Sequence, residues 1–335
     1  MRYAAFIFTV FIAMGQLFAA TGPDVSAARV LLDKAGVNAT VCEMPRVGDG
    51  TLAAALAQQG LAQVHALAAD NTAADAARPP SFTAGVLGSH VIIETGSPSA
   101  LPLGNWVADL YVVADATDKN LKALSALEAA RVLSPYRGVA VVGNPAGTKA
   151  HLSKAALTAW AKGAGGNVTV IDDADGLWAV SKMPALKGGD DWGHYNHDAD
   201  GNPVSNDTTV TVGRFNMQWH AKPIWADKFD TYVAAGGRLF CAHGAIYWRW
   251  AARVPYEMET RNIYNGQVLW RRPIPQTFGN LGSVMVATPD RVYVADSDGV
   301  LVLNAETGAE IRRIVITDPN KQCRCLLYTS PSPRD

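Results

Sequence analysis

The sequence predicts two kinds of structure in one chain: an α/β domain built on a doubly wound parallel sheet, followed by repeated antiparallel β-sheets. Apolar strand patterns alternate with helical patterns from residue 25 to about residue 186, which is typical of a parallel sheet covered by helices on both faces. Farther along, residues 229–316 contain one pattern of alternating apolar runs and glycine turns twice. A chain of 335 residues is long enough for two such domains.

The elements of the α/β segment follow from its periodicity. Helices are expected at residues 25–34, 52–59, 73–78, 121–133 and 152–162. Strands are expected at residues 37–44, 64–69, 90–94, 106–114 and 138–143. Two further strands, at 167–171 and 177–181, are separated by a short turn, and we expect them to close the sheet as an antiparallel hairpin.

Several stretches of this segment match the motifs of one enzyme family. Residues 47–56 read Val-Gly-Asp-Gly-Thr-Leu-Ala-Ala-Ala-Leu, a glycine turn that leads into a helix, and residues 64–70 read as the next strand with an acid after it. Together with the closing hairpin, the series resembles the class I S-adenosylmethionine (SAM) methyltransferase fold. The resemblance implies that Gly48 and Gly50 let the backbone approach the cofactor, and that Asp70 accepts hydrogen bonds from the ribose hydroxyls.

The sequence departs from this family at the cofactor turn. Arg46 aligns with the family's first glycine, and its side chain would stand where the cofactor approaches the backbone. The family's opening acid aligns with Met44, with Glu43 one position away. Ala68 aligns with the acid that binds the ribose, so Asp70, two positions later, could replace it only if the loop bends.

A further departure is Tyr136-Arg137, which stands where the family has two glycines. We therefore expect a methyltransferase-like fold without a working cofactor site. The alternative is an active methyltransferase that holds SAM through Gly48, Gly50 and Asp70.

The second half of the chain repeats one pattern. Gly266 and Gly308 are 42 positions apart, and each follows an Asn- or Thr-containing turn and precedes an apolar run. This spacing is within the usual period of a β-propeller blade, and each copy is expected to form four short strands. The repeats resemble those of quinoprotein-like (PQQ-like) propellers, which implies two blades of a ring that needs about 4–8 of them.

A polar segment at residues 191–207 precedes the repeats. It contains His194 and His197 among several Asp and Asn residues. The spacing fits no EF-hand loop, and His-x-x-His alone is a weak zinc signal. We expect a turn-rich lead-in and assign no metal ligand.

The two ends of the chain have compositions of their own. Residues 1–20 carry Arg2, an apolar stretch and small residues at the end, which is typical of a secretory signal peptide, with a retained anchor as the alternative. Residues 325–335 resemble one reading frame of a transposase adapter used in shotgun sequencing. We therefore expect these residues to be an artefact and the chain to be the amino-terminal part of a longer protein.

The expected boundaries are a signal peptide at 1–20, a methyltransferase-like Rossmann domain at 25–186, a lead-in at 187–218, propeller blades at 219–324 and adapter-derived residues at 325–335. No later segment is apolar for long enough to span a membrane beyond the signal peptide. The net charge of −1, without a basic run interleaved with aromatic residues, argues against a nucleic-acid partner. Cys42 and Cys241 are expected to be buried free thiols.

Three functions are compatible with these features. The combination of the two domains resembles large exported bacterial proteins, notably from planctomycetes, and implies a secreted or periplasmic binding or scaffold protein whose propeller engages an unknown ligand or protein partner. The second function is an active SAM-dependent methyltransferase. The third is a dehydrogenase that holds pyrroloquinoline quinone (PQQ) in a propeller whose other blades are missing. No catalytic residue can be assigned from the sequence.

Overall fold

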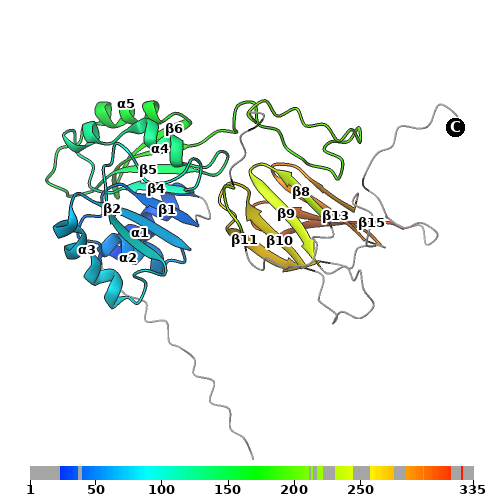
Figure 1. The fold of residues 1–335 in the computed structure, drawn as a ribbon, viewed down its shortest axis with the longest axis horizontal. Coiled ribbons are helices and arrows are strands. Elements are labelled where there is room, and N and C mark those ends of the chain that lie inside the picture. Colours follow the sequence, from blue (N-terminus) through cyan, green and yellow to red (C-terminus); the bar gives the residue numbers. More distant parts are fainter. Residues whose placement is uncertain are drawn as a thin grey trace, which may run out of the picture.

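The computed structural model describes residues 23–36, 40–210, 213, 217–221, 231–243, 257–274, 284–296, 298–317 and 326. Within these ranges the chain forms an α/β domain and two antiparallel sheets, which a long loop joins (Figure 1). The expected signal peptide and the expected adapter residues other than Leu326 lie outside the described residues.

Seven strands form the sheet of the α/β domain, in the order β3-β2-β1-β4-β5-β7-β6. They are β1 (Val41–Met44), β2 (Gln63–Ala68), β3 (Val91–Thr95), β4 (Leu110–Val113), β5 (Val139–Pro145), β6 (Asn167–Asp173) and β7 (Gly176–Lys182). Strands β1 to β5 are parallel, whereas β7 runs antiparallel to both β5 and β6. The predicted doubly wound sheet with a closing hairpin is confirmed, and the strand order reverses between β1 and β4.

Helices cover both faces of this sheet. They are α1 (Pro23–Ala35), α2 (Thr51–Gln58), α3 (Asn71–Thr83), the 3₁₀ helix η1 (Asn120–Ala123), α4 (Ala126–Val132) and α5 (Lys154–Ala164). Helices α1 to α3 share one apolar core with the sheet, and η1, α4 and α5 share a second core on the other face. Among the described residues, no helix combines the length and the apolar character that crossing a bilayer requires.

Several of the expected elements are wrong in extent. The helix expected at 73–78 begins at Asn71 and continues through Pro79 and Pro80 to Thr83 as α3. The helix expected at 121–133 is broken, because Leu124 is extended and the Ser125 side chain accepts a hydrogen bond from the Glu128 amide, which starts α4 anew. The strand expected at 106–114 is shorter than expected. Trp106 has a φ of 63°, a left-handed conformation that cannot continue a strand.

The rest of the described chain forms two four-stranded antiparallel sheets. The first has the order β11-β10-β9-β8 and the second the order β12-β13-β14-β15. Their strands are β8 (Thr231–Ala235), β9 (Arg238–His243), β10 (Glu257–Asn262), β11 (Val268–Pro273), β12 (Met285–Ala287), β13 (Arg291–Asp296), β14 (Gly299–Asn304) and β15 (Glu310–Val315). The predicted pair of four-stranded units is confirmed. Both sheets contribute to one shared apolar core.

A contact between tryptophan and glycine occurs twice in this part of the chain. Trp270 lies against Gly308, and its Nε1 donates a hydrogen bond of 3.1 Å to the carbonyl three residues before that glycine. Trp219 contacts Gly266 in the same way, with a hydrogen bond of 2.8 Å. Neither glycine leaves room for a Cβ, and each has a positive φ. The two sheets therefore share one packing rule as well as one sequence pattern.

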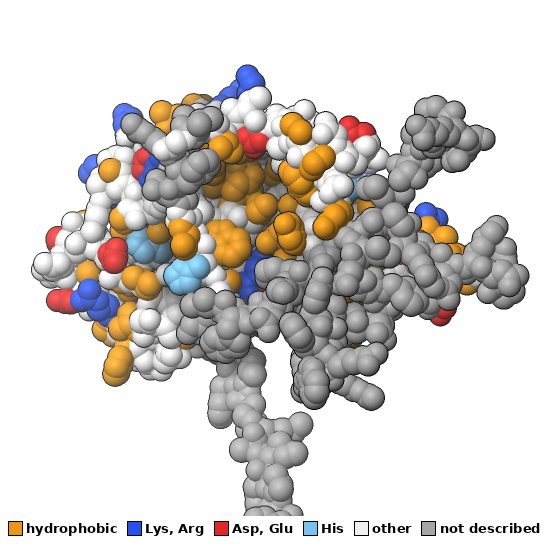
Figure 2. Space-filling model, turned by 45° about the vertical axis from the view of Figure 1, so that its right-hand side comes forward, with side chains coloured by type: hydrophobic (Ala, Val, Ile, Leu, Met, Phe, Trp, Pro, Cys, Tyr) orange, Lys and Arg blue, Asp and Glu red, His pale blue; other side chains and the backbone are white. Residues whose placement is uncertain are grey.

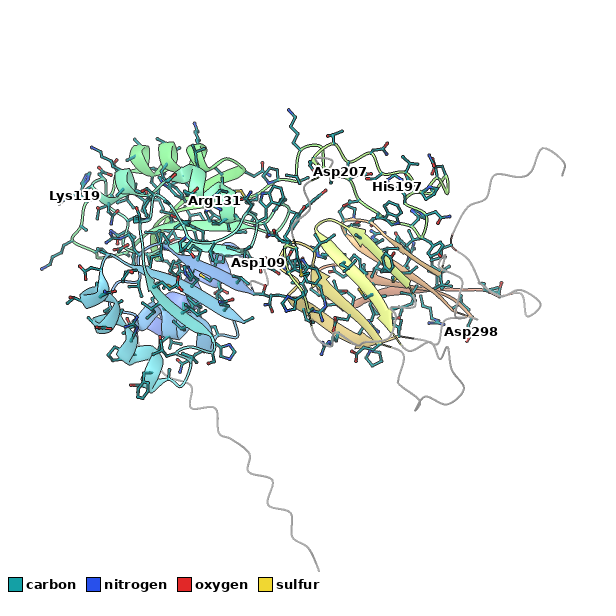
Figure 3. All side chains as sticks on the ribbon, viewed as in Figure 1. Asp109, Lys119, Arg131, His197, Asp207 and Asp298 are labelled. Carbon is teal, nitrogen blue, oxygen red and sulfur yellow. The ribbon has the colours of Figure 1, made fainter. Side chains whose placement is uncertain are left out.

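The first antiparallel sheet contacts the α/β domain at the edge formed by the amino ends of the parallel strands. Asp109, immediately before β4, is fully buried and lies between the two parts (Figure 3). Within its own domain it accepts hydrogen bonds from the amide and hydroxyl of Thr40 and from the hydroxyl of Ser134. From the β10–β11 turn, the side-chain amides of Asn262 and Asn265 donate to it at 2.5 and 3.3 Å. One carboxylate thus joins the two parts.

The corresponding turn of the second sheet also contacts the α/β domain. Glu306, between β14 and β15, accepts a hydrogen bond of 2.6 Å from Arg137 and a second one from Arg238. Burial acts to raise the pKa of Glu306, but the two guanidinium groups outweigh it and hold the pKa below its ordinary value. Equivalent turns of both sheets therefore dock on the same edge of the α/β domain.

The two cysteines in the described residues, Cys42 and Cys241, are buried and form no disulfide, as expected. Burial raises the pKa of both thiols, that of Cys241 to about 12. A buried thiol with a raised pKa is unreactive, so both act as small apolar side chains.

Candidate functional site

A cleft lies at the carboxyl ends of β1, β2 and β3. Its cavity measures about 510 Å³. The residues that line it come from the end of β2, the start of α3 and the loops after the three strands: Pro45, Arg46, Val47, Gly48, Leu67, Ala68, Ala69, Ala73, Gly96, Ser97 and Pro98. Doubly wound sheets bind ligands at this edge, beside the point where the strand order reverses. The cleft is therefore the place at which the sequence resemblance puts a cofactor.

The structure separates the two glycines that the sequence pairs. Gly48 lines the cleft with a φ of 62°, and no atom lies within 4 Å of the position that a Cβ would take. Gly50 also has a positive φ, but a Cβ there would clash with the carbonyl oxygen of Ala77 in α3. Gly48 is thus part of the cleft surface, whereas Gly50 allows α2 and α3 to pack closely.

Asp70, the expected ribose acceptor, caps a helix. Its Oδ1 accepts a hydrogen bond of 2.8 Å from the amide of Ala73 at the start of α3. It is not among the residues that line the cavity, where Ala68 ends β2 and Ala69 follows. The structure therefore brings Gly48, but neither Gly50 nor Asp70, to the cleft surface.

An ion pair spans the point where the strand order reverses. Arg46, in the loop after β1, donates from Nε and Nη2 to the carboxylate of Asp115, which follows β4, at distances of 2.7–3.2 Å. The two side chains are 40% and 52% exposed, so the pair stands in solvent at the mouth of the cleft. Sequence reasoning singled out Arg46 and missed Asp115, although an acid directly after a buried strand is a usable signal.

Below the cleft, a histidine lies between two glutamates in the sheet. The carboxylate of Glu43, on β1, is fully buried and lies 2.5 Å from Nδ1 of His65 on β2. Nε2 of His65 lies 3.4 Å from the carboxylate of Glu94 on β3. Burial acts to lower the pKa of His65, but the hydrogen bond and charge of Glu43 outweigh it, and the pKa is raised. Glu43, close to the family's opening acid in the sequence, is therefore a partner of His65.

The cleft offers little for acid–base chemistry. Among the described residues that line it, Arg46 is the one charged side chain, and the hydroxyl of Ser97 is engaged with that of Ser99 at 2.7 Å. General acid–base catalysis needs a titratable group within hydrogen-bonding distance of the substrate. The lining residues are suited to packing against an apolar or planar group.

A second cavity, of about 250 Å³, lies between the α/β domain, the long loop and the first antiparallel sheet. Its walls include the aromatic residues Trp106, Tyr136 and Tyr264 and the acids Asp190, Asp191 and Asp207. Figure 2, which turns the antiparallel sheets forward, shows a hollow surrounded by hydrophobic side chains. Sequence reasoning missed this cavity, because its residues come from three separate parts of the chain.

The polar segment at 191–207 forms turns and one bridge to β8. The backbone of Trp192 exchanges two hydrogen bonds of 2.8 Å with that of Ala234. His197 Nε2 lies 2.7 Å from the carboxylate of Asp190, which also accepts a hydrogen bond from the Ser205 hydroxyl. Within the described ranges, no three His, Cys, Asp or Glu side chains are grouped as metal ligands would be.

No family model matches the chain, and no curated protein sequence matches it. Among solved structures, a candidate SAM-dependent methyltransferase from Methanococcus maripaludis is 18% identical over 49% of this chain and 85% of its own, with a TM-score of 0.42. The YcgJ protein from Bacillus subtilis is 16% identical over 44% and 70%, with a TM-score of 0.37. An O-methyltransferase family protein from Burkholderia thailandensis is 14% identical over 48% and 57%, with a TM-score of 0.39.

These likenesses concern the fold alone. The α/β domain has a methyltransferase-like Rossmann fold, and this assignment depends on the strand order of the chain itself, with its antiparallel β7 inserted between β5 and β6. Because one fold serves many chemistries, its function has to be argued from the site.

Proposed function

We propose that the chain is an exported binding protein in which a methyltransferase-like domain, without methyl-transfer activity, is docked on blades of a PQQ-like β-propeller. The two four-stranded sheets and the repeated tryptophan–glycine contact support the assignment of blades. The sequence pattern at 1–20 supports export. The propeller would present loops to a ligand or protein partner.

The ion pair between Arg46 and Asp115 is the main observation in support of the proposed absence of methyl-transfer activity. It spans the crevice beside Gly48, where a cofactor would have to approach the backbone. A bound SAM would have to displace the guanidinium group and would find Ala68 and Ala69 where its ribose needs an acceptor. A buried hydroxyl left without a partner costs about 1–3 kcal/mol.

Calorimetric titration of the whole chain with SAM, and separately with its demethylated product, tests this proposal. We expect no saturable heat at ligand concentrations up to the millimolar range. Micromolar binding that Asp70→Ser abolishes would overturn the proposal. Serine keeps the helix cap that Asp70 provides but removes its charge. Asp75→Ser, on the exposed side of the same helix, is the matched control.

An active methyltransferase is the second candidate. The open cleft of about 510 Å³, with unobstructed space above Gly48, favours it. Arg46→Gly distinguishes the two functions, because it restores the glycine of the family motif. A gain of SAM binding in Arg46→Gly that the parent chain lacks would indicate a site closed by Arg46. Binding and methyl transfer in the parent chain would instead support the active enzyme.

The assignment of blades has a test of its own in the native gene. We expect its reading frame to continue beyond residue 324 with further copies of the glycine-turn pattern at intervals of roughly 40–50 residues. A stop codon directly after Asp335, with the preceding residues unchanged, would contradict this expectation.

A further inference from the structure

We propose that the cavity at the domain junction binds a methylated ammonium group, either of a free small molecule or on a side chain of a partner protein. The cavity of about 250 Å³ is formed by both folded parts and by the loop that joins them. Trp106 and Tyr136 come from the α/β domain, Tyr264 comes from the β10–β11 turn, and Asp191 and Asp207 come from the loop. Figure 3 shows Asp207 on this loop, near the place where the two parts meet.

The aromatic residues provide ring surfaces of the kind that bind organic cations. The rings of Trp106 and Tyr264 meet edge to face, with centroids 6.0 Å apart and planes inclined at 72°. In this arrangement the two ring planes are steeply inclined to each other and form a corner. Tyr136 adds a third ring to the lining. Aromatic faces around a cavity attract quaternary and methylated ammonium groups through the ring quadrupole.

The backbone holds two of these aromatic residues in place. Trp106 and Tyr136 have φ values of 63° and 64°, a conformation that bulky residues seldom adopt. The amide of Trp106 donates 2.9 Å to the carbonyl of Arg131, and the amide of Tyr136 donates 3.0 Å to the carbonyl of Pro184. The backbone of both residues is thus fixed by contacts outside the cavity, so little backbone ordering is needed when a ligand binds.

The charges that line the cavity are unbalanced. Three carboxylates, those of Asp190, Asp191 and Asp207, and one guanidinium group, that of Arg238, line the cavity, and the Asp190 carboxylate contacts His197. Arg238 is already engaged, because it pairs with Glu306 and donates 3.1 Å to two backbone carbonyls. Within the described ranges, neither Asp191 nor Asp207 forms an ion pair with a lysine or arginine. A cationic ligand would therefore supply a positive charge that Asp191 and Asp207 do not receive from a lysine or an arginine.

The raised pKa values of two lining groups, Asp191 and Tyr264, agree with this imbalance, whereas hydrogen bonds hold the pKa values of Asp190 and Asp207 below their ordinary values. Burial, and to a smaller extent the charge of Asp190, raises the pKa of Asp191. Burial also raises the pKa of Tyr264, to which Tyr136, Asp191 and Asp207 add. These groups are therefore close enough to act on one another, and each disfavours further negative charge in the cavity. A bound cation would relieve this repulsion.

The shape and chemistry of the cavity exclude two simpler ligands. No group of three carboxylate or imidazole side chains in the described part of the chain is arranged to hold a metal ion. An anion would be repelled by the three acids. The aromatic walls favour a charge spread over apolar substituents, as in tetramethylammonium, over a small hydrated ion.

The inference goes beyond the proposed function, and each can fail without the other. The junction cavity lies at the amino ends of β4 and β5, whereas the cleft in which SAM would bind lies at the carboxyl ends of β1, β2 and β3. A chain that binds SAM could still bind a cation at the junction, and a chain that binds neither would overturn this inference alone.

Calorimetric titration of the whole chain with choline tests the proposal, and 3,3-dimethylbutan-1-ol, its uncharged isostere, is the matched control ligand. We expect saturable choline binding in the millimolar range or tighter, and at least tenfold weaker binding of the alcohol. A short peptide that carries trimethyllysine forms the second arm. Tighter binding of the peptide would assign the group to a protein partner, and tighter binding of choline would assign it to a small molecule.

Variants locate the binding. We expect Asp191→Asn and Tyr264→Leu each to weaken choline binding about tenfold or more. Asp200→Asn and Tyr195→Leu, two exposed residues of the same loop region outside the cavity, should leave the affinity unchanged. Trp106→Phe keeps an aromatic ring, so it should retain binding but lose part of the ligand-induced change in tryptophan fluorescence. Far-UV circular dichroism and the melting temperature identify any variant that does not fold.

Three results would overturn the proposal. One is that neither choline nor the peptide binds to the folded chain. Another is that the uncharged alcohol binds as tightly as choline, which would make the cavity merely apolar. The third is that folded Asp191→Asn and Tyr264→Leu both bind choline with the affinity of the parent chain.

Discussion

The two ends of strand β4 each carry an aspartate, and the protein uses these two side chains in opposite ways. Asp109, at the amino end, is fully buried and accepts hydrogen bonds from both the α/β domain and the first antiparallel sheet. Asp115, beyond the carboxyl end, is 52% exposed and pairs with Arg46 across the mouth of the cleft. One strand thus connects a packed polar junction to an open edge.

This difference indicates which edge of the sheet determines the architecture. Doubly wound sheets usually place their function at the carboxyl edge, which here has one solvent-screened ion pair and lining side chains that are mostly small or apolar. The amino edge holds the turns of both antiparallel sheets through Asp109 and Arg137. The amino edge of the α/β domain is therefore the edge on which both antiparallel sheets dock.

The largest expected effect is the difference in the free energy of unfolding between two single variants, Asp109→Ala and Asp115→Ala. Asp109→Ala leaves the buried donors of Ser134 and Asn262 and the partly buried amide of Thr40 without this acceptor. At about 1–3 kcal/mol for each unsatisfied group, we expect the free energy of unfolding to fall by at least about 3 kcal/mol. Asp115→Ala removes an exposed pair and should cost less than about 1 kcal/mol.

Urea denaturation of both variants measures this contrast. Equal losses of stability in the two variants would contradict the difference between the edges. A loss in Asp109→Ala that is confined to the unfolding of one part would show that the junction contributes little to cooperativity.

A smaller contrast is expected within the cleft turn, between Gly50 and Gly48. Both have positive φ values, so alanine at either position carries the strain of a left-handed conformation, about 1–2 kcal/mol. At Gly50 the new methyl group would also collide with the carbonyl of Ala77, whereas at Gly48 it would meet open space. We expect Gly50→Ala to destabilise the chain by at least about 1 kcal/mol more than Gly48→Ala does.

Thermal unfolding of the two glycine variants checks this expectation, because the strain common to both cancels in the difference. Equal melting temperatures would mean that α3 can shift away from Gly50 without loss. In that case Gly50 would again be a candidate for the cofactor turn.

The smallest expected effect concerns His65, which lies in the sheet between the two edges, and the pH dependence of stability. The pKa of His65 is raised above its ordinary value of 6.5, so the folded state binds the proton more tightly than the unfolded state. The resulting stabilisation is fully present below pH 6.5 and disappears as the pH rises through the raised value. We expect stability to decline over this window, and His65→Gln to remove that part of the decline.

Urea unfolding at a series of pH values from 5.5 to about 8.5 tests the sign of this dependence. His151→Gln, which changes an exposed histidine, is the control. Stability that rises over this window in the parent chain, but not in His65→Gln, would show that the ring is held neutral in the folded state.

The order of the helices and strands could be predicted from the sequence, whereas the hydrogen-bond and ion-pair partners of the polar side chains could not. Apolar runs located every parallel strand of the α/β sheet, because burial on both faces leaves near-continuous apolar stretches. The break at Leu124 escaped detection, since a serine cap competes with an otherwise continuous helical pattern. The different roles of Gly48 and Gly50 depend on where α3 lies, which local periodicity does not specify.

The same limit applies to the two cavities. Arg46 was identified from the motif, but its partner Asp115 follows another strand and becomes a neighbour only through the strand order. The junction cavity draws on residues from the α/β domain, the loop and the β10–β11 turn. A single sequence contains no pattern that relates residues so far apart.

The contact between Asp109 and Asn262 also has a consequence for the order of folding. These residues are 153 positions apart in the chain, and Arg137 and Glu306 are 169 positions apart. The strands of each antiparallel sheet, in contrast, are joined mostly to their immediate neighbours in sequence. Because distant contacts form only after the entropy of closing a long loop has been overcome, we expect docking of the two parts to be the last step. During refolding the hairpins would then form while the junction, and with it the cavity, is still absent.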